Sequence, residues 1–187
     1  MRPGFSFHQN TERSLSARTL GYLIALISFA VDQASKLGML YGFEIEAVMR
    51  REGPVSVAPF LDLVLVWNRG ISYGLLQQDS ELGRYLLIGL AVVASILLSV
   101  WLWRLTDRLT ALGLGLILGG ALGNGLDRIL HGAVVDLFHF HWGTFSWYVF
   151  NLADVWIVVG AAFLVYESFF GSKDTADKSG RNDAANQ

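Results

Sequence analysis

The 187-residue sequence contains no cysteine, which excludes disulfide bonds, thiolate nucleophiles, cysteine-ligated zinc and iron–sulfur clusters. Charged residues make up only 16% of the chain, against about 25% in a typical globular domain. The formal net charge is −2, and no basic stripe is present to contact phosphates, so nucleic acid is not an expected partner. Hydrophobic residues make up 53% of the chain, and a soluble fold this short has too much surface to hide them. The composition therefore predicts a membrane protein.

Four apolar segments predict an all-α membrane fold with four transmembrane helices. Residues 85–103 carry no charge and have about the length that one bilayer crossing requires. The complete set of expected spans is 19–40, 85–103, 110–129 and 151–170. Glycines in the third span recur at four-residue spacing, at Gly115, Gly119 and Gly123, which is typical of closely packed membrane helices.

The remaining residues are expected to form a polar segment (1–18) before the membrane domain (19–170) and a polar tail (171–187) after it. Lysine and arginine occur in both terminal segments and in the 104–108 turn, but not in 131–148. This bias predicts that both termini are cytoplasmic. The composition of the tail predicts disorder.

The two loops on the other side, 41–84 and 130–150, are then extracytoplasmic. Residues 60–67 and 144–149 within them are rich in strand-forming side chains. They predict a small extracytoplasmic region that contains β-structure.

Ionisable residues are costly at membrane depth, so each needs a partner or a function. Five polar clusters fall at the predicted extracytoplasmic ends of the spans: Asp32-Gln33 with Lys36, Asn68-Arg69-Gly70, Asn124 with Asp127-Arg128, Asp136, and Asn151 with Asp154. Because helix ends and loops meet at this boundary, we expect the clusters to converge into one site.

Most of these clusters also have a purely structural interpretation. Asp32 and Lys36 are four residues apart and can neutralise each other on one helix face, which is the interpretation that we favour for this pair. Asn151 can cap the last helix, with Asp154 at the third helical position as in a capping box.

Asp136 is harder to explain in this way, because it lies in the apolar stretch GAVVDLFHF without an adjacent basic residue. Desolvation raises the pKa of such a carboxyl. If Asp154 lies close by, the two carboxyls share one proton and titrate as a pair. A pair of this kind can hydrolyse an amide without a metal or a cofactor, since one carboxylate accepts a proton from water and the other acid protonates the leaving nitrogen.

Two other motifs suggest different chemistry but lack the context that each requires. Residues 70–74 match G-x-S-x-G, with Ser72 as the nucleophile, but the chain offers no soluble α/β sheet for a nucleophile elbow. His139 and His141, with His131 and Asp136 nearby, are metal-ligating residue types, but no H-E-x-x-H is present. We therefore expect neither a serine nucleophile nor a bound metal.

Two further functional classes remain as alternatives. A small transporter or channel predicts acidic residues spread through the bilayer depth, whereas the acidic residues here collect at one boundary. A structural membrane subunit predicts that the aspartates and asparagines only cap and pair helices.

The polar clusters lie within four sequence motifs, which occur in this order: VDQASK (31–36), NRGISYGLL (68–76), GNGLDRILHGAVVDLFHF (123–140) and FNLADVWIVVG (150–160). Their order and spacing strongly resemble those of the lipoprotein signal peptidase (signal peptidase II) family over roughly residues 20–168. The resemblance implies a four-helix aspartyl protease of the bacterial inner membrane, with membrane lipids and a lipid-modified prolipoprotein substrate as partners and no cofactor. It implies cleavage on the amino side of a diacylglyceryl-modified cysteine, at a site that faces the periplasm. We expect the chain to be a monomer.

The resemblance also implies roles for individual residues. Asp136 and Asp154 match the catalytic pair. The positions that bind substrate or support the pair are Asp32, Asn68, Gly70, Asn124, Asp127, Arg128, Asn151 and Ala153. Two candidates for the partner of Asp154 remain. The helical spacing favours a structural role for Asp127 as a neighbour of Arg128, and the apolar surroundings of Asp136 favour Asp136 as the partner. The chain departs from the family's N-x-G-x-A-F motif, with Ser72 and Tyr73 at the last two positions.

Overall fold

The structure is a computed structural model that describes residues 15–70 and 81–185. Its elements, in order, are α1 (Ala17–Leu37), a π-helical turn (Gly38–Gly42), α2 (Ile45–Glu52), β1 (Val55–Ala58), β2 (Leu61–Asn68), α3 (Glu81–Trp103), α4 (Arg108–His131), β3 (Val134–Trp142), β4 (Phe145–Phe150) and α5 (Leu152–Ala185). Within this part of the chain, four helices are long and apolar enough to cross a membrane, as the sequence predicted. The four expected spans each fall largely within one of these helices.

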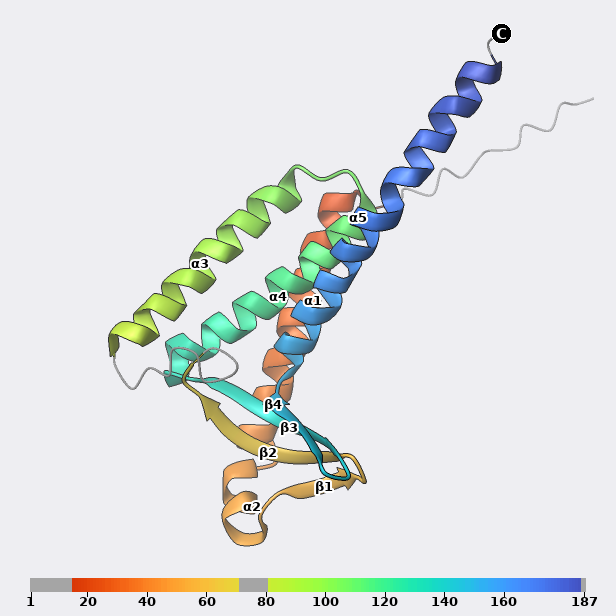
Figure 1. Cartoon of the computed structure of the whole chain (residues 1–187). Coiled ribbons are helices and arrows are strands. Elements are labelled where there is room, and N and C mark those ends of the chain that lie inside the picture. The colour runs from red at the N-terminus through yellow and green to blue at the C-terminus, as the bar shows by residue number, and fades with distance from the viewer. Residues whose placement is uncertain (1–14, 71–80, 186–187) are drawn as a thin grey trace, which may run out of the picture.

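Helix α4 is the centre of the bundle and packs against α1, α5 and α3 (Figure 1). The glycines of α4 allow this close packing: Gly115 and Gly119 face the backbone of α1, and Gly120 faces α5. A Cβ atom on Gly120 would lie 2.5 Å from the carbonyl oxygen of Ala153. The four-residue glycine spacing therefore marks a helix–helix contact, as the sequence predicted.

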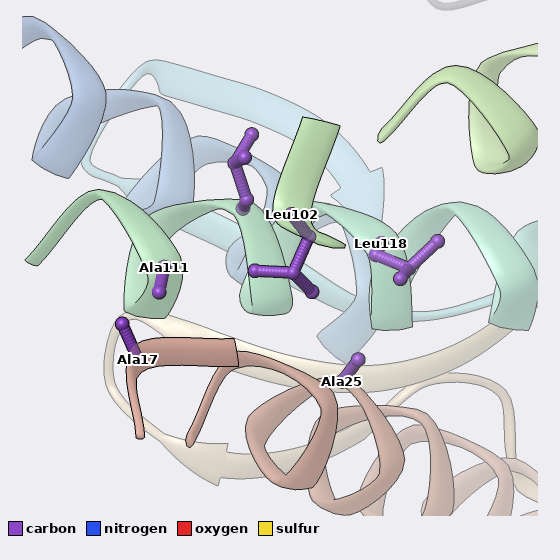
Figure 2. Close-up of a cluster of buried hydrophobic side chains, with 6 residues drawn as sticks. Ala17, Ala25, Leu102, Ala111 and Leu118 are labelled. Carbon is purple, nitrogen blue, oxygen red and sulfur yellow. The ribbon is translucent and has the colours of Figure 1, made fainter. Parts of the chain in front are cut away.

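A cluster of buried apolar side chains joins three of the helices. In Figure 2, Leu102 of α3 lies among Ala17 and Ala25 of α1 and Ala111 and Leu118 of α4. Leu102 is fully buried, and the small alanines leave room for it. The cluster fixes the end of the bundle that is farther from the sheet (Figure 1).

Local signals set the ends of α4 and the entry into the sheet. Asp107 caps the start of α4 and accepts a hydrogen bond from the backbone N–H of Thr110 at 2.6 Å. Gly132 ends α4 in the left-handed conformation, with φ of 73°, which a residue with a Cβ adopts only at a cost. The chain leaves α4 directly into β3, the strand that carries Asp136.

The strands of the described residues form one antiparallel sheet in the order β1-β2-β3-β4, at the end of the bundle where α4 ends and α5 begins (Figure 1). The predicted strand segments 60–67 and 144–149 form β2 and β4. These two strands do not pair with each other, because β3 lies between them and pairs with both. Residues 134–142, which form β3, were expected to be a loop, because the first four are all buried and therefore lack the alternation typical of a half-buried strand.

The fold class therefore needs a correction. Four long helices are present, but the all-α description is incomplete, because a four-stranded sheet lies within the described residues. Helix α5 extends as one helix to Ala185.

Candidate active site

The polar clusters meet at the end of the bundle that adjoins the sheet. Helix α1 brings Asp32 and Lys36 there, β2 brings Asn68, α4 brings Asn124, Asp127 and Arg128, β3 brings Asp136, and the start of α5 brings Asn151 and Asp154. Hydrogen bonds connect residues from all five elements. The convergence expected from the sequence is thus present in the structure.

Asp136 is almost fully buried, at 2% exposure, and accepts hydrogen bonds on both carboxyl oxygens. The amide of Asn68 donates to Oδ2 at 3.0 Å, and the amide of Asn151 donates to Oδ1 at 2.6 Å. The pairing of β2 with β3 explains the contact between Asn68 and Asp136. Val66 is opposite Asp136, and Asn68 lies two residues farther along β2, on the same face of the sheet. The two amides fix the direction in which the carboxyl group points.

Asp154 lies in the first turn of α5 and forms a capping box with Asn151. The backbone N–H of Asn151 donates to Asp154 Oδ2 at 3.2 Å, and the backbone N–H of Asp154 donates to Asn151 Oδ1 at 3.1 Å. The amide of Asn124 donates to Asp154 Oδ1 at 2.9 Å. Asn151 therefore contacts both Asp154 and Asp136, so the structural cap predicted from the sequence also joins the two carboxyls.

The environment of Asp136 favours its protonated form. Burial raises the pKa of this carboxyl to about 7, and the negative charge of Asp154 adds to the shift. The amide donors of Asn68 and Asn151 act in the opposite direction and do not cancel it. At neutral pH and below, Asp136 is thus available as a proton donor.

A cleft of about 430 Å³ opens onto the two carboxyls. Its polar part is formed by Asn68, Asp136 and Asp154. Its walls come from residues 147–150 of β4 and from Ile157 and Val158 of α5, and they are mostly apolar. An apolar cleft with a few convergent polar groups is the usual form of a ligand site.

The other predicted residues surround this pair. Arg128 donates to the backbone oxygens of Asn124 and Gly70, each at 3.2 Å. The backbone N–H of Gly70 donates to Asn68 Oδ1 at 3.1 Å and thereby orients the amide that contacts Asp136. Arg128 Nε is buried without a hydrogen-bond partner among the described residues.

Comparison with known proteins identifies the family. The family model described as Signal peptidase (SPase) II matches residues 24–170, which is most of the chain. The chain belongs to the signal peptidase II family. As a signal peptidase II family member it is a peptidase, and its apolar helices make it an integral membrane protein.

Individual relatives agree with this assignment to signal peptidase II. The lipoprotein signal peptidase of Beijerinckia indica is 53% identical over 155 residues, which cover 83% of this chain and 90% of the relative. The lipoprotein signal peptidase of Methylocella silvestris is 50% identical over 159 residues, which cover 85% of this chain and 91% of the relative. A solved bacterial membrane enzyme has the same fold, with a TM-score of 0.69 at 24% identity over 84% of this chain and 90% of that one.

Asp127 and Asp136, the two candidate partners of Asp154 in the sequence, have different neighbours in the structure of this signal peptidase II chain. Asp127 contacts Lys36 and the backbone N–H of Val135, whereas Asp136 is joined to Asp154 through Asn151. The sequence predicted only that Lys36 neutralises Asp32, whereas in the structure Lys36 is buried and contacts Asp127 and Asn124 as well as Asp32. A lysine in a predicted membrane helix was the available signal.

The histidines considered as metal ligands do not join the signal peptidase II site. Ser72 lies outside the described residues. His139 and His141 lie near Asp62, at 3.9 and 3.1 Å, rather than near Asp136. Within the described ranges, no group of three or more metal-ligating side chains is arranged to hold an ion.

Proposed function

We propose that this chain is an aspartyl endopeptidase that removes the signal peptide from prolipoproteins, on the amino side of the diacylglyceryl-modified cysteine. The observation that carries the proposal is that Asp136 and Asp154 line the same cleft and are both hydrogen-bonded to Asn151. The names of the relatives, lipoprotein signal peptidase, support the choice of substrate.

The two carboxyls have settings that suit different roles. Because its pKa is raised to about 7, Asp136 is still protonated in about half of the molecules at neutral pH. Asp154 accepts hydrogen bonds on both oxygens and lies at the N-terminus of α5, a setting that suits an anion. We therefore assign the acid to Asp136 and the base to Asp154.

The reaction then consumes one water molecule. Asp154 accepts a proton as the water oxygen bonds to the scissile carbonyl carbon, while Asp136 donates a hydrogen bond to the carbonyl oxygen. When the carbon–nitrogen bond breaks, a proton from the pair passes to the nitrogen of the lipid-modified cysteine. The cleaved signal peptide leaves with a free carboxylate.

The same chemistry suggests where the site lies in the membrane. A diacylglyceryl group keeps its acyl chains in the bilayer, so the scissile bond must lie near the interface. The sheet end of the bundle exposes Trp142 and Phe145 at the tip of the β3–β4 hairpin, and aromatic side chains favour membrane interfaces. Lysine and arginine occur in both terminal segments and in the 104–108 turn at the other end of the bundle, so we place the sheet and the cleft at the periplasmic face of the inner membrane, with both chain termini in the cytoplasm.

Purified protein is expected to cleave a prolipoprotein that carries the diacylglyceryl group and to leave the unlipidated precursor intact. Product formation is measured by mass spectrometry, with and without a metal chelator and a serine-directed reagent. Neither reagent is expected to slow the reaction, because the proposed chemistry uses only carboxyls. Equal cleavage of both substrates, or loss of cleavage with the chelator, would contradict the proposal.

The pH dependence gives an independent check on the assignment of acid and base. As the pH rises through about 7, Asp136 loses the proton that the leaving nitrogen requires, so kcat/KM is expected to fall. The profile is measured between about pH 6 and pH 9, with tryptophan fluorescence as the control for folding. A flat profile over this range would remove Asp136 from the role of acid.

A further inference from the structure

Lys36 is a buried cation directly behind the two carboxyls of the cleft. It lies in the last turn of α1, and its side chain is 2% exposed. Its ammonium group contacts Asp32 Oδ2 and Asp127 Oδ2, both at 2.8 Å, and donates to Asn124 Oδ1 at 3.1 Å. An ammonium group has three N–H donors, so these contacts use all of them and fix its position.

Each acid partner of Lys36 also holds a backbone N–H group next to one of the cleft carboxyls. Asp32 Oδ1 accepts a hydrogen bond from the N–H of Ala153 at 2.9 Å, one residue before Asp154. Asp127 Oδ2 accepts a hydrogen bond from the N–H of Val135 at 3.1 Å, one residue before Asp136. Lys36 therefore links the segment of β3 and the segment of α5 that carry the two carboxyls.

The third contact of Lys36 reaches Asp154 through Asn124. The ammonium group can only donate hydrogen bonds and an ionised carboxylate can only accept them, so the amide oxygen of Asn124 must face Lys36. The amide nitrogen is then directed at Asp154 Oδ1, to which it donates at 2.9 Å. Lys36 thus determines which end of the Asn124 amide meets Asp154, together with the amide of Asn151, which donates to the same oxygen at 3.2 Å.

Stability alone does not explain three buried ionisable groups at this position. Asp32, Asp127 and Lys36 are 0%, 1% and 2% exposed. The cost of removing charges from water often exceeds the attraction between them, and apolar side chains of similar volume pack at least as well. Charged groups, unlike apolar ones, form directed contacts to backbone N–H groups and to an amide.

We infer that Asp32, Lys36 and Asp127 form a positioning triad that fixes the separation and orientation of the Asp136 and Asp154 carboxyls. The triad acts through the backbone of Val135 and Ala153 and through the Asn124 amide, and none of its members lines the cleft. The inference depends on the proposed function, since it assumes that these two carboxyls do the chemistry.

The test is the double variant Lys36→Met/Asp32→Asn, which removes one positive and one negative charge and leaves the net charge of the triad unchanged. Asparagine keeps an oxygen that can accept from Ala153. We expect kcat for the lipidated prolipoprotein to fall by about 100-fold in the folded protein, because small displacements of catalytic groups have effects of this size. KM is expected to change by less than about two-fold, because the cleft walls that contact the substrate are unchanged and substrate binding is retained.

A second readout separates positioning from general destabilisation. The charged groups that act on Asp136 are Asp154 from α5, Arg128 from α4 and Lys36 from α1. The positive charge of Lys36 favours ionised Asp136, so in the double variant the falling limb of kcat/KM is expected to move to higher pH. The matched control is Glu46→Gln/Arg50→Met, which removes an i,i+4 ion pair on the exposed surface of α2 and should keep the wild-type kcat and profile.

Wild-type kcat and an unmoved pH limb in the folded double variant would overturn the inference. So would the absence of folded protein from both the double variant and Asp127→Asn, because the triad would then serve folding alone. These results differ from a failure of the proposed function, in which the wild-type protein does not cleave the lipidated substrate.

Discussion

Asp136→Asn is expected to lower kcat by a factor of about 10² to 10⁴, which is the usual contribution of a positioned acid or base. The amide has nearly the shape of the carboxyl group but cannot supply a proton to the leaving nitrogen. The protein should remain folded, because asparagine can still form hydrogen bonds with Asn68 and Asn151 after the amides reorient. Cleavage of the lipidated prolipoprotein by equal amounts of monodisperse protein measures the effect.

The matched control for this variant is Asp62→Asn. Asp62 lies on the neighbouring strand β2 of the same sheet, pairs with His139 in the ladder, and does not line the cleft. This control should cleave at the wild-type rate. If Asp136→Asn also cleaved at that rate, Asp136 would have no part in the reaction, and another group would have to supply the proton.

Gly120→Leu is expected to separate α4 from α5 and to lower the free energy of unfolding by about 3 kcal/mol or more, at the upper end of the usual cost of overpacking. The Cβ atom alone would lie 2.5 Å from the backbone oxygen of Ala153 and 2.8 Å from Ile157 Cγ1. A backbone atom cannot rotate away, so α5 as a whole must shift. Because Ala153 directly precedes Asp154, cleavage should be lost together with stability.

Unfolding in detergent, followed by tryptophan fluorescence, measures this loss. Gly89→Leu is the control, because a Cβ atom on Gly89 would meet nothing within 4 Å on the exposed face of α3. The control should unfold like the wild-type protein. A Gly120→Leu variant with wild-type stability would show that α4 and α5 do not pack as closely as the structure indicates.

Local patterns in the sequence predicted much of the fold. Spans such as 85–103 are recognisable because the bilayer accepts only long apolar helices whose backbone groups are satisfied internally. The capping box of Asn151 and Asp154 is equally local, since its two residues are three apart. Strand β3 was missed because burial on both faces removes the alternation that identifies a strand.

The site itself was predicted only as a gathering of polar residues. The sequence pointed to Asp136 through its apolar neighbours, but the contact of Asn151 with both carboxyls needed coordinates. For Lys36, the nearby Asp32 offered a complete structural explanation, and the two distant partners changed that interpretation. A residue with one local partner can thus have a second set of contacts that periodicity does not reveal.

The sequence by itself determined that this chain resides in a membrane, that it crosses in helices, and that its costly polar groups collect at one boundary. These properties follow from the partition of each segment between water and lipid, which depends on local composition. Only the tertiary structure decided which partners these polar groups contact. Those contacts join residues such as Asn124 and Lys36, 88 positions apart, or Ala153 and Asp32, 121 positions apart, and they arise from helix packing rather than from any local preference.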